Sequence, residues 1–216
     1  MIKGIIFDLD GVLVSTDELH FQAWRRLAEE LSINDFTKED NARQKGVSRR
    51  ESLEIVLEKG EKSFTDAEKI TLAEKKNGYY VELLQDLSNT AVLPGVFEVL
   101  ARLRAKGLLI GIGSVSKNTP QILKLTGLEP YIDQVSCGLD IKNSKPDPEV
   151  FLVAAEKLGL APEECLVVED SKAGIVAAKA ALMLSLGVGP EHNQLGADYE
   201  AISLQSNIDW DALLDA

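Results

Sequence analysis

A short apolar run that ends in two carboxylates constrains this chain more than any other feature. Residues 4–7 read Gly-Ile-Ile-Phe and are followed by Asp8, Leu9, Asp10 and Gly11. Such a run is typical of a strand that is covered on both faces, as in a parallel sheet between helices. Ligands of these sheets bind beyond the carboxyl ends of the strands, so we expect both carboxylates at a ligand site.

Asp8 and Asp10 are two residues apart, so in extended backbone their side chains lean to the same side. Two like charges this close are costly unless a cation, a proton or a catalytic role offsets the repulsion. The pair therefore predicts a metal-assisted site in which one carboxylate is the nucleophile and the other is the acid and base. The alternative is a helix-capping Asp followed by a turn Asp before Gly11.

Strand and helix signals alternate through the second half of the chain. Strands are expected at 108–112, 134–137, 165–168 and 184–187, and helices at 96–107, 119–127, 147–159 and 173–181. This alternation predicts βαβ units, and so an α/β, Rossmann-like core whose parallel sheet is flanked by helices.

The stretch from residue 15 to residue 90 carries no convincing strand signal, and residues 38–88 are rich in Glu, Lys and Leu. Capping boxes are expected at Ser15–Glu18 and at Thr65–Glu68. We therefore predict a small helical cap domain at 15–91, inserted after the first strand, and a catalytic core at 1–14 and 92–216. The two chain crossings would form a hinge between cap and core.

The composition of the chain disfavours some classes of binding partner. A formal net charge of -12 over 216 residues argues against nucleic acid or an anionic membrane as a partner. No apolar run approaches the roughly 20 residues that span a bilayer. Because the first strand begins directly at the N-terminus, we expect no signal peptide. Cys137 and Cys165 form no paired motif, so we expect reduced, packed thiols in a cytoplasmic protein, and a monomer.

Four groups of polar residues lie next to predicted strands and helices. Three of them follow a predicted strand, and the fourth lies in the loop before a predicted helix. They are Asp8 with Asp10, then Ser114, then Lys145 before Pro146, and finally Glu169 with Asp170. This order resembles the four motifs of the haloacid dehalogenase superfamily over nearly the full length of the chain. The resemblance implies that Asp8 attacks phosphorus and becomes an aspartyl phosphate. It implies that Asp10 protonates the leaving oxygen and later deprotonates the next nucleophile.

The same resemblance implies a magnesium site and a phosphate cradle. Mg²⁺ prefers oxygen ligands, which Asp8, Asp170, the Asp10 backbone carbonyl and Glu169 would supply. Lys145 would add a positive charge beside Asp8, and Ser114 would hold phosphoryl oxygens together with backbone N–H groups. Taken singly, these residues also fit a surface lysine, a turn hydroxyl and a helix-capping pair.

Within the superfamily, further segments resemble enzymes that interconvert hexose phosphates. The segments hold Thr16, His20, Phe21, Ala23 and Trp24, then Lys45, Gly46, Val47, Ser48, Arg49 and Ser52, then Lys76 and Asn77, and finally Ser114 to Asn118. The resemblance implies conversion of β-glucose 1-phosphate to glucose 6-phosphate, a small-molecule hexose phosphate, through β-glucose 1,6-bisphosphate as intermediate and activator.

An enzyme of this kind must hold a bisphosphate in two orientations. Arg49 is suited to the phosphate distant from Asp8, because a guanidinium can grip phosphate with two parallel bonds. Donors on the core side would come from Ser116, Lys117 and Asn118, and backbone contacts from Gly46 and Val47.

Three further cap residues each fit two roles. His20 could reach Asp10 when the cap closes, or could be a polar residue that flanks a helix. For Trp24, packing within the cap is a better interpretation than stacking against the sugar. Lys76 also fits a solvated helix face. His192 receives no role.

Two departures from the superfamily pattern stand out. Ser15 replaces a residue that is commonly acidic, which the capping box would explain. Leu182 replaces a turn glycine, and leucine at a position that favours positive φ costs stability unless the loop takes another conformation.

A phosphatase of the same fold is the main rival function. A dehalogenase or phosphonate hydrolase is disfavoured by Asp10, because neither mechanism calls for that acid. A phospho-acceptor signalling domain is disfavoured by the helical insertion.

Overall fold

The computed structural model describes residues 1–44, 47–206 and 208–214. The chain divides into two compact units, one of Met1–Ser15 with Ser88–Ala216 and the other of Thr16–Leu87. We call them the core unit and the cap unit. The second boundary falls before residue 88 rather than after 91, because the 3₁₀ turn Asn89–Ala91 belongs to the core unit.

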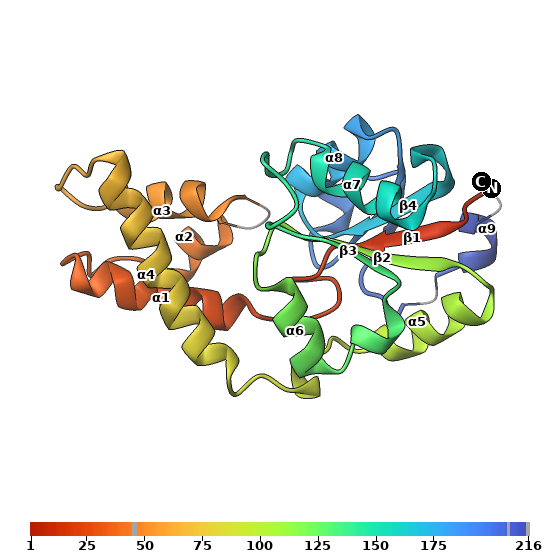
Figure 1. The fold of residues 1–216 in the computed structure, drawn as a ribbon, viewed down its shortest axis with the longest axis horizontal. Coiled ribbons are helices and arrows are strands. Elements are labelled where there is room, and N and C mark those ends of the chain that lie inside the picture. Colours follow the sequence, from red (N-terminus) through yellow and green to blue (C-terminus); the bar gives the residue numbers. More distant parts are fainter. Residues whose placement is uncertain (45–46, 207, 215–216) are drawn as a thin grey trace. The chain divides into compact units, whose positions relative to one another are not determined.

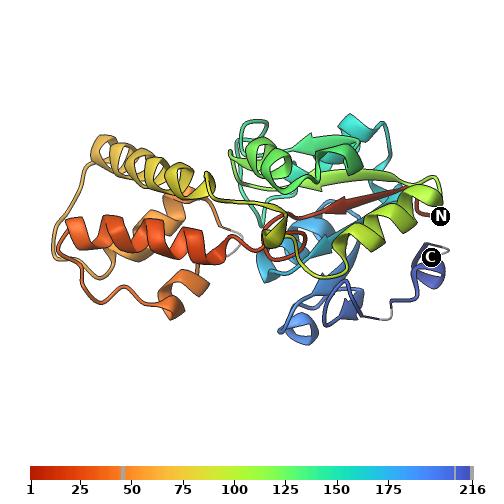
Figure 2. The ribbon, with the colours of Figure 1, turned by 90° about the horizontal axis from the view of Figure 1, so that it is seen from below.

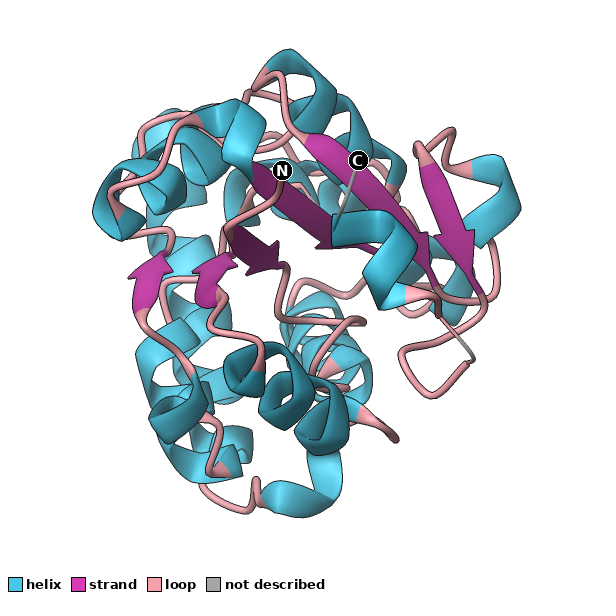
Figure 3. Ribbon diagram, turned by 90° about the vertical axis from the view of Figure 1, so that its right-hand side faces the viewer, coloured by secondary structure: helices cyan, strands magenta, loops and turns pink. Residues whose placement is uncertain are grey.

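In the described part of the core unit, six parallel strands form one sheet in the order β3-β2-β1-β4-β5-β6 (Figure 3). The strands are β1 (Gly4–Phe7), β2 (Leu109–Gly113), β3 (Gln134–Ser136), β4 (Cys165–Glu169), β5 (Leu184–Val188) and β6 (Tyr199–Ala201). The α/β prediction is confirmed, and β6 is an addition to it. Because β1 is central, its carboxyl end meets those of β2 and β4.

Helices cover both faces of this sheet. They are α5 (Val96–Ala105), α6 (Thr119–Thr126), α7 (Glu149–Leu158), α8 (Lys172–Ala180) and α9 (Trp210–Leu214). Figure 1 shows α7 and α8 on one face and α5 on the other. Beneath α7 and α8, Phe151 packs with Ile6 and Val167 in a cluster of buried side chains. This burial removes apolar surface from water and holds the strands in register.

The cap unit is helical throughout its described elements, as predicted. It contains α1 (Asp17–Glu30), α2 (Lys38–Ala42), α3 (Arg49–Leu57) and α4 (Asp66–Leu84). Figure 2 shows α1 and α4 side by side. Trp24 and Leu27 of α1 and Tyr80 and Leu84 of α4 are buried.

One capping prediction is confirmed and the other is wrong. The Thr65 hydroxyl accepts from the Glu68 N–H, and the Glu68 carboxylate accepts from the Thr65 N–H, so the predicted box begins α4. At α1 the N-cap is Thr16 rather than Ser15, and its side chain makes no capping bond. The reason is that Ser15 is held outside the helix, where its N–H donates to the Ala91 carbonyl.

The two linkers between the units pair with each other. Val14 and Val92 form an antiparallel bridge. On either side of it, the Ser15 N–H donates to the Ala91 oxygen at 2.9 Å and the Leu93 N–H to the Leu13 oxygen at 2.9 Å. The inserted segment therefore leaves the core unit and returns to it at one place.

Other expectations concerned single residues. Cys137 and Cys165 are free and buried, as predicted. Leu182 does adopt a positive φ of 62°, so leucine occupies the left-handed conformation that glycine usually takes. In the described part of the chain, no helix is both long and apolar enough to cross a bilayer.

Candidate active site

The neighbouring strands β1 and β4 place two carboxylates side by side. Phe7 of β1 is paired in register with Val168 of β4, so Asp8 lies beside Glu169. The Asp8 N–H donates to the Val168 oxygen at 2.9 Å, which continues the ladder past the end of β1. The strand order reverses at β1, and this is where open α/β sheets bind ligands.

Lys145 joins these two carboxylates. Its ammonium donates to Asp8 Oδ1 at 2.5 Å and to Glu169 Oε2 at 2.8 Å, and lies 4.8 Å from the centre of the Phe151 ring. The side chain is 1% exposed, which excludes the surface-lysine interpretation. Burial lowers the pKa of Lys145, but Asp8 and Glu169 raise it by more, so the ammonium stays protonated.

Glu169 is held from every side. Its Oε1 accepts from the N–H groups of Asp170 and Ser171 and from the Ser171 hydroxyl at 2.8 Å, while Oε2 accepts from Lys145. A Cβ at Gly174 in α8 would lie 2.0 Å from Glu169 Cδ. The carboxylate therefore occupies space that only glycine leaves open.

Three carboxylates converge on one point that fits a divalent cation. Ligand oxygens of Asp8, Glu169 and Asp170 lie within 4.8 Å of one another. Burial raises the pKa of Asp8 well above its usual value. Glu169 and Asp170 raise it further, against the lowering effect of Lys145. One lysine does not neutralise three acids, and hard oxygen ligands suit Mg²⁺.

The predicted ligands differ in how well they fit. Both oxygens of Glu169 already accept hydrogen bonds, so this carboxylate would bind a metal only by giving up one of those bonds. Asp10 lies half-buried in the turn after β1. Its neighbour Gly11 has a φ of 89°, and a Cβ there would lie 2.1 Å from Asp170 Oδ2. The turn thus passes directly against the Asp170 carboxylate.

The loop after β2 is ordered by its own hydroxyl groups. Ser114 is buried, and its Oγ accepts from the Ser116 N–H, while Ser116 Oγ accepts from the Asn118 N–H, both at 3.2 Å. The loop leads into α6, and Lys117 is exposed within it. A preformed loop with hydroxyl and N–H donors before a helix is suited to phosphate.

In the cap unit, the predicted residues His20, Trp24 and Lys76 come together. Lys76 Nζ lies 2.8 Å from His20 Nδ1 and 4.6 Å from the centre of the Trp24 ring. Burial lowers the pKa of His20 well below its usual value, and Lys76 and Arg49 lower it further. Lys76 is 2% exposed, so the solvated-face interpretation of this lysine is wrong.

The other predicted cap residues take mixed positions. Thr16 and Ser52 are buried, Val47 lies in the bend before α3, and Ser48 is the N-cap of that helix. Arg49 is the first residue of α3 and is half-buried. Burial lowers its pKa, while Glu74 and Tyr80 act to raise it. The predicted contacts of Lys45 and Gly46 fall outside the described residues.

Three residues that the sequence did not predict also shape the site. Ser171 caps α8 and also holds Glu169, and its place before a helical stretch was the signal. Gly174 gives Glu169 its space, which only tertiary structure reveals. Tyr80 stacks on His20, and its spacing of four residues from Lys76 on one helix face was the available clue.

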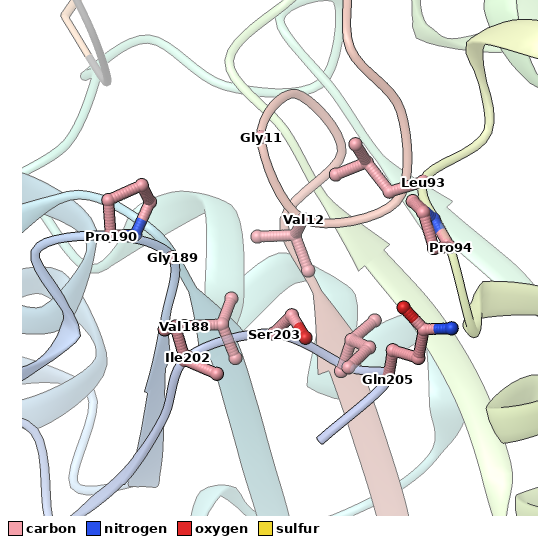
Figure 4. Close-up of a pocket in the computed structure, with 11 residues that line it drawn as sticks. Gly11, Val12, Leu93, Pro94, Val188, Gly189, Pro190, Ile202, Ser203 and Gln205 are labelled. Carbon is pink, nitrogen blue, oxygen red and sulfur yellow. The ribbon is translucent and has the colours of Figure 1, made fainter.

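A separate pocket of about 230 Å³ lies beside the turn after β1 (Figure 4). Val12, Pro94, Val188 and Ile202 give it apolar walls, with Ser203 among the few polar groups. None of the described residues that line it is charged, so it does not suit a phosphate. The carboxylate cluster remains the candidate active site.

Known families and proteins resemble this chain over most of its length. The model of one family, the haloacid dehalogenase-like hydrolases, matches residues 5–188. The chain belongs to this family. It is 41% identical over 199 residues to a β-phosphoglucomutase of Bacillus subtilis, covering 91% of this chain and 88% of that protein. It is 37% identical over 186 residues to a phosphorylated carbohydrates phosphatase of Thermotoga maritima, with coverage of 83% and 82%.

The fold agrees with these relatives. The crystal structure of a β-phosphoglucomutase from Clostridium difficile superposes with a TM-score of 0.91 at 37% identity, covering 100% of this chain and 96% of that one. The family, the fold and the similarity to phosphoryl-transfer enzymes of sugar metabolism are thus established together.

Proposed function

We propose that this chain acts as a β-phosphoglucomutase that interconverts β-D-glucose 1-phosphate and D-glucose 6-phosphate. The observation that carries the proposal is the buried Asp8 carboxylate, which Lys145 holds at the end of β1 beside Glu169 and Asp170. Similarity to β-phosphoglucomutases over nearly the whole chain supports the same reaction.

The proposed chemistry runs through a covalent phosphoenzyme. With glucose 1,6-bisphosphate bound, a carboxylate oxygen of Asp8 attacks the phosphorus of the 1-phosphate, and the bond from phosphorus to the C1 oxygen breaks. Asp10 gives its proton to that oxygen as it leaves, so glucose 6-phosphate is formed. In the other half-reaction Asp10 takes the proton from the C6 hydroxyl of β-glucose 1-phosphate. The C6 oxygen attacks the aspartyl phosphate, which frees Asp8 and forms the bisphosphate again.

The surrounding residues are assigned to binding the metal ion, orienting Asp8 and holding the phosphoryl group. Asp8, Asp170 and the Asp10 carbonyl would hold Mg²⁺, with Glu169 beside them, and the ion would supply electrostatic stabilisation for the transferring group. Lys145 keeps the attacking carboxylate in one orientation. The Ser114 Oγ accepts from the Ser116 N–H and retains its own hydrogen for a phosphoryl oxygen.

Lys117 and Asn118 in the same loop are assigned to the sugar phosphate. The second phosphate of the bisphosphate is assigned to the cap unit. Arg49 and Lys76 place two cations near His20 in a chain whose net charge is -12. Such a local concentration of positive charge is suited to a phosphate group. Thr16, Trp24, Lys45, Gly46, Val47 and Ser52 complete the proposed substrate contacts.

A sugar-phosphate phosphatase is the second candidate, because a relative at 37% identity bears that name. The two functions share the attack by Asp8 and differ in the acceptor. Water accepts the phosphoryl group in a phosphatase, and the sugar accepts it in a mutase.

The first experiment separates these outcomes. Purified protein is incubated with β-glucose 1-phosphate, Mg²⁺ and a trace of glucose 1,6-bisphosphate, and glucose 6-phosphate and inorganic phosphate are both measured. A mutase forms glucose 6-phosphate with little phosphate. Stoichiometric phosphate release would replace the proposal by the phosphatase. In Asp8→Asn, the phosphoenzyme should be absent from the intact-mass spectrum.

A pair of neighbouring arginines tests the cap phosphate contact. Arg49→Ala should raise the bisphosphate concentration at half-maximal rate by on the order of tenfold or more, because a charge-assisted contact is lost. Arg50→Ala is the matched control, since Arg50 is exposed and paired with Asp66 at 2.8 Å. Equal kinetics for the two variants would remove Arg49 from the proposal.

A further inference from the structure

Two aromatic rings enclose the pair formed by His20 and Lys76. The Tyr80 ring stacks on the His20 imidazole with a centroid distance of 4.0 Å and an interplanar angle of 27°. The Lys76 ammonium lies 4.9 Å from the Tyr80 ring centre and 4.6 Å from that of Trp24. All four residues lie on α1 and α4, which pack against each other.

The contact between Lys76 and His20 fixes where the imidazole carries its proton. A charged ammonium has only N–H donors, and two aromatic faces favour this charged form. At 2.8 Å, His20 Nδ1 must therefore be the acceptor. A neutral imidazole that accepts at Nδ1 carries its hydrogen on Nε2.

We propose that Tyr80 is a positioning residue that holds His20 as a permanent Nε2–H donor. Its ring sets the plane of the imidazole from one side. With Trp24, the same ring keeps the Lys76 ammonium in line with Nδ1. Tyr80 itself is fully buried, so its place does not vary with solvent.

The groups that face His20 all favour its neutral form. Lys76 on α4 and Arg49 on α3 are cations that lower the pKa of His20. Glu74 on α4 raises the pKa of Arg49 and so favours its charged form. A second proton on the imidazole would meet two positive charges. The donor at Nε2 therefore persists across the neutral pH range. A fixed N–H donor suits an enzyme whose acid and base is a carboxylate, because a carboxylate accepts hydrogen bonds. In that respect the inference rests on the proposed mutase function.

The chain contains a built-in control for this inference. It has two histidines, His20 and His192. His192 Nδ1 lies 2.8 Å from the Gly189 carbonyl oxygen, and a carbonyl can only accept. His192 must therefore carry its hydrogen on Nδ1 when neutral, which is the opposite tautomer. A ¹⁵N NMR spectrum of the imidazoles at pH 7.5, assigned with His192→Gln, should show one ring of each kind.

Variants at Tyr80 then test the role of the ring. Tyr80→Phe keeps the aromatic face and should retain the His20 spectrum of the wild type. Tyr80→Leu removes the face, so His20 should show averaged tautomer shifts and titrate nearer to an ordinary histidine. If the leucine variant does not fold, Tyr80→Met serves the same purpose, because methionine also lacks an aromatic face and has a volume similar to that of leucine. The His192 signals should not change in any of them.

Two results would overturn the inference. One is a wild-type His20 with its hydrogen on Nδ1. The other is a leucine or methionine variant whose His20 spectrum matches that of the wild type. Kinetically, loss of the ring should lower kcat on the order of tenfold, because the orientation of His20 is lost. If the protein has no mutase activity but the spectra behave as stated, the proposed function fails while the role of Tyr80 stands.

Discussion

Gly174 offers a sharp test of how the active-site carboxylates are held. Replacing it by alanine adds a Cβ that would lie 2.0 Å from Glu169 Cδ and 2.1 Å from Oε2. Glu169 is 1% exposed and is bonded to Lys145 and Ser171, so it cannot swing into solvent without breaking those bonds.

The magnitude follows from three effects. Overpacking of a dense interior costs about 1–3 kcal/mol. Loss of one charge-assisted hydrogen bond of Glu169 costs about 1.5–3 kcal/mol. Alanine in place of glycine within α8 restores about 1 kcal/mol of helix propensity. We therefore expect Gly174→Ala to lower the free energy of unfolding by about 1.5–5 kcal/mol.

Gly78→Ala is the matched control. Gly78 lies within α4, and a Cβ there would meet nothing within 4 Å. The substitution keeps the propensity gain without the clash, so it should raise the free energy of unfolding by about 0.5–1 kcal/mol.

Each unit contains one tryptophan that can report its unfolding, Trp24 in the cap unit and Trp210 in the core unit. Urea unfolding of Gly174→Ala is followed by Trp210 in a Trp24→Phe background. Gly78→Ala is followed by Trp24 in a Trp210→Phe background. The variant of α8 should also lose most of its activity, because the partner of Lys145 is displaced. An active Gly174→Ala protein as stable as the wild type would refute the reasoning.

Three further predictions address single features. Leu182→Gly should raise the free energy of unfolding by about 0.5–1 kcal/mol in urea, because it removes the cost of a positive φ at leucine, whereas Leu182→Ala should not. Burial raises the pKa of Cys165 to about 11, so the folded state keeps this proton after the unfolded chain releases it near pH 8.5. Stability should therefore fall by about 2 kcal/mol between pH 8 and 10, a decrease that Cys165→Ala should lack in the same titration. Saturating Mg²⁺ at a hundredfold excess over its Kd should stabilise the core by about 2.7 kcal/mol, EDTA should reverse this, and a persistent effect in Asp170→Asn would count against the metal site.

Much of the fold followed from the pattern of residues. The apolar run before Asp8 and the alternation after residue 96 predicted the parallel sheet, because strands buried on both faces have a recognisable composition. β6 escaped prediction, since Tyr199–Ala201 is short and lies at the edge of the sheet. The cap of α1 was misplaced because Ser15 pairs with Ala91, a contact between residues distant in the sequence.

The candidate site divides in the same way. The predicted strand ends placed Asp8 and Glu169 at one edge of the sheet, and the resemblance to the superfamily added Lys145. The sequence did not reveal that Lys145 bridges both acids or that Gly174 makes room for one of them. These facts depend on side-chain packing across separate elements. The stacking of Tyr80 on His20 similarly depends on how α1 and α4 pack.

The paired linkers have a practical meaning for protein engineering. Val14 lies opposite Val92, so the residues flanking the whole insertion are already neighbours. A two- or three-residue turn could join Ser15 to Ala91 and yield a truncated enzyme that retains its sheet. The same junction would accept a different inserted domain whose ends lie close together. Chimaeras that carry different cap units could therefore be built on one core unit.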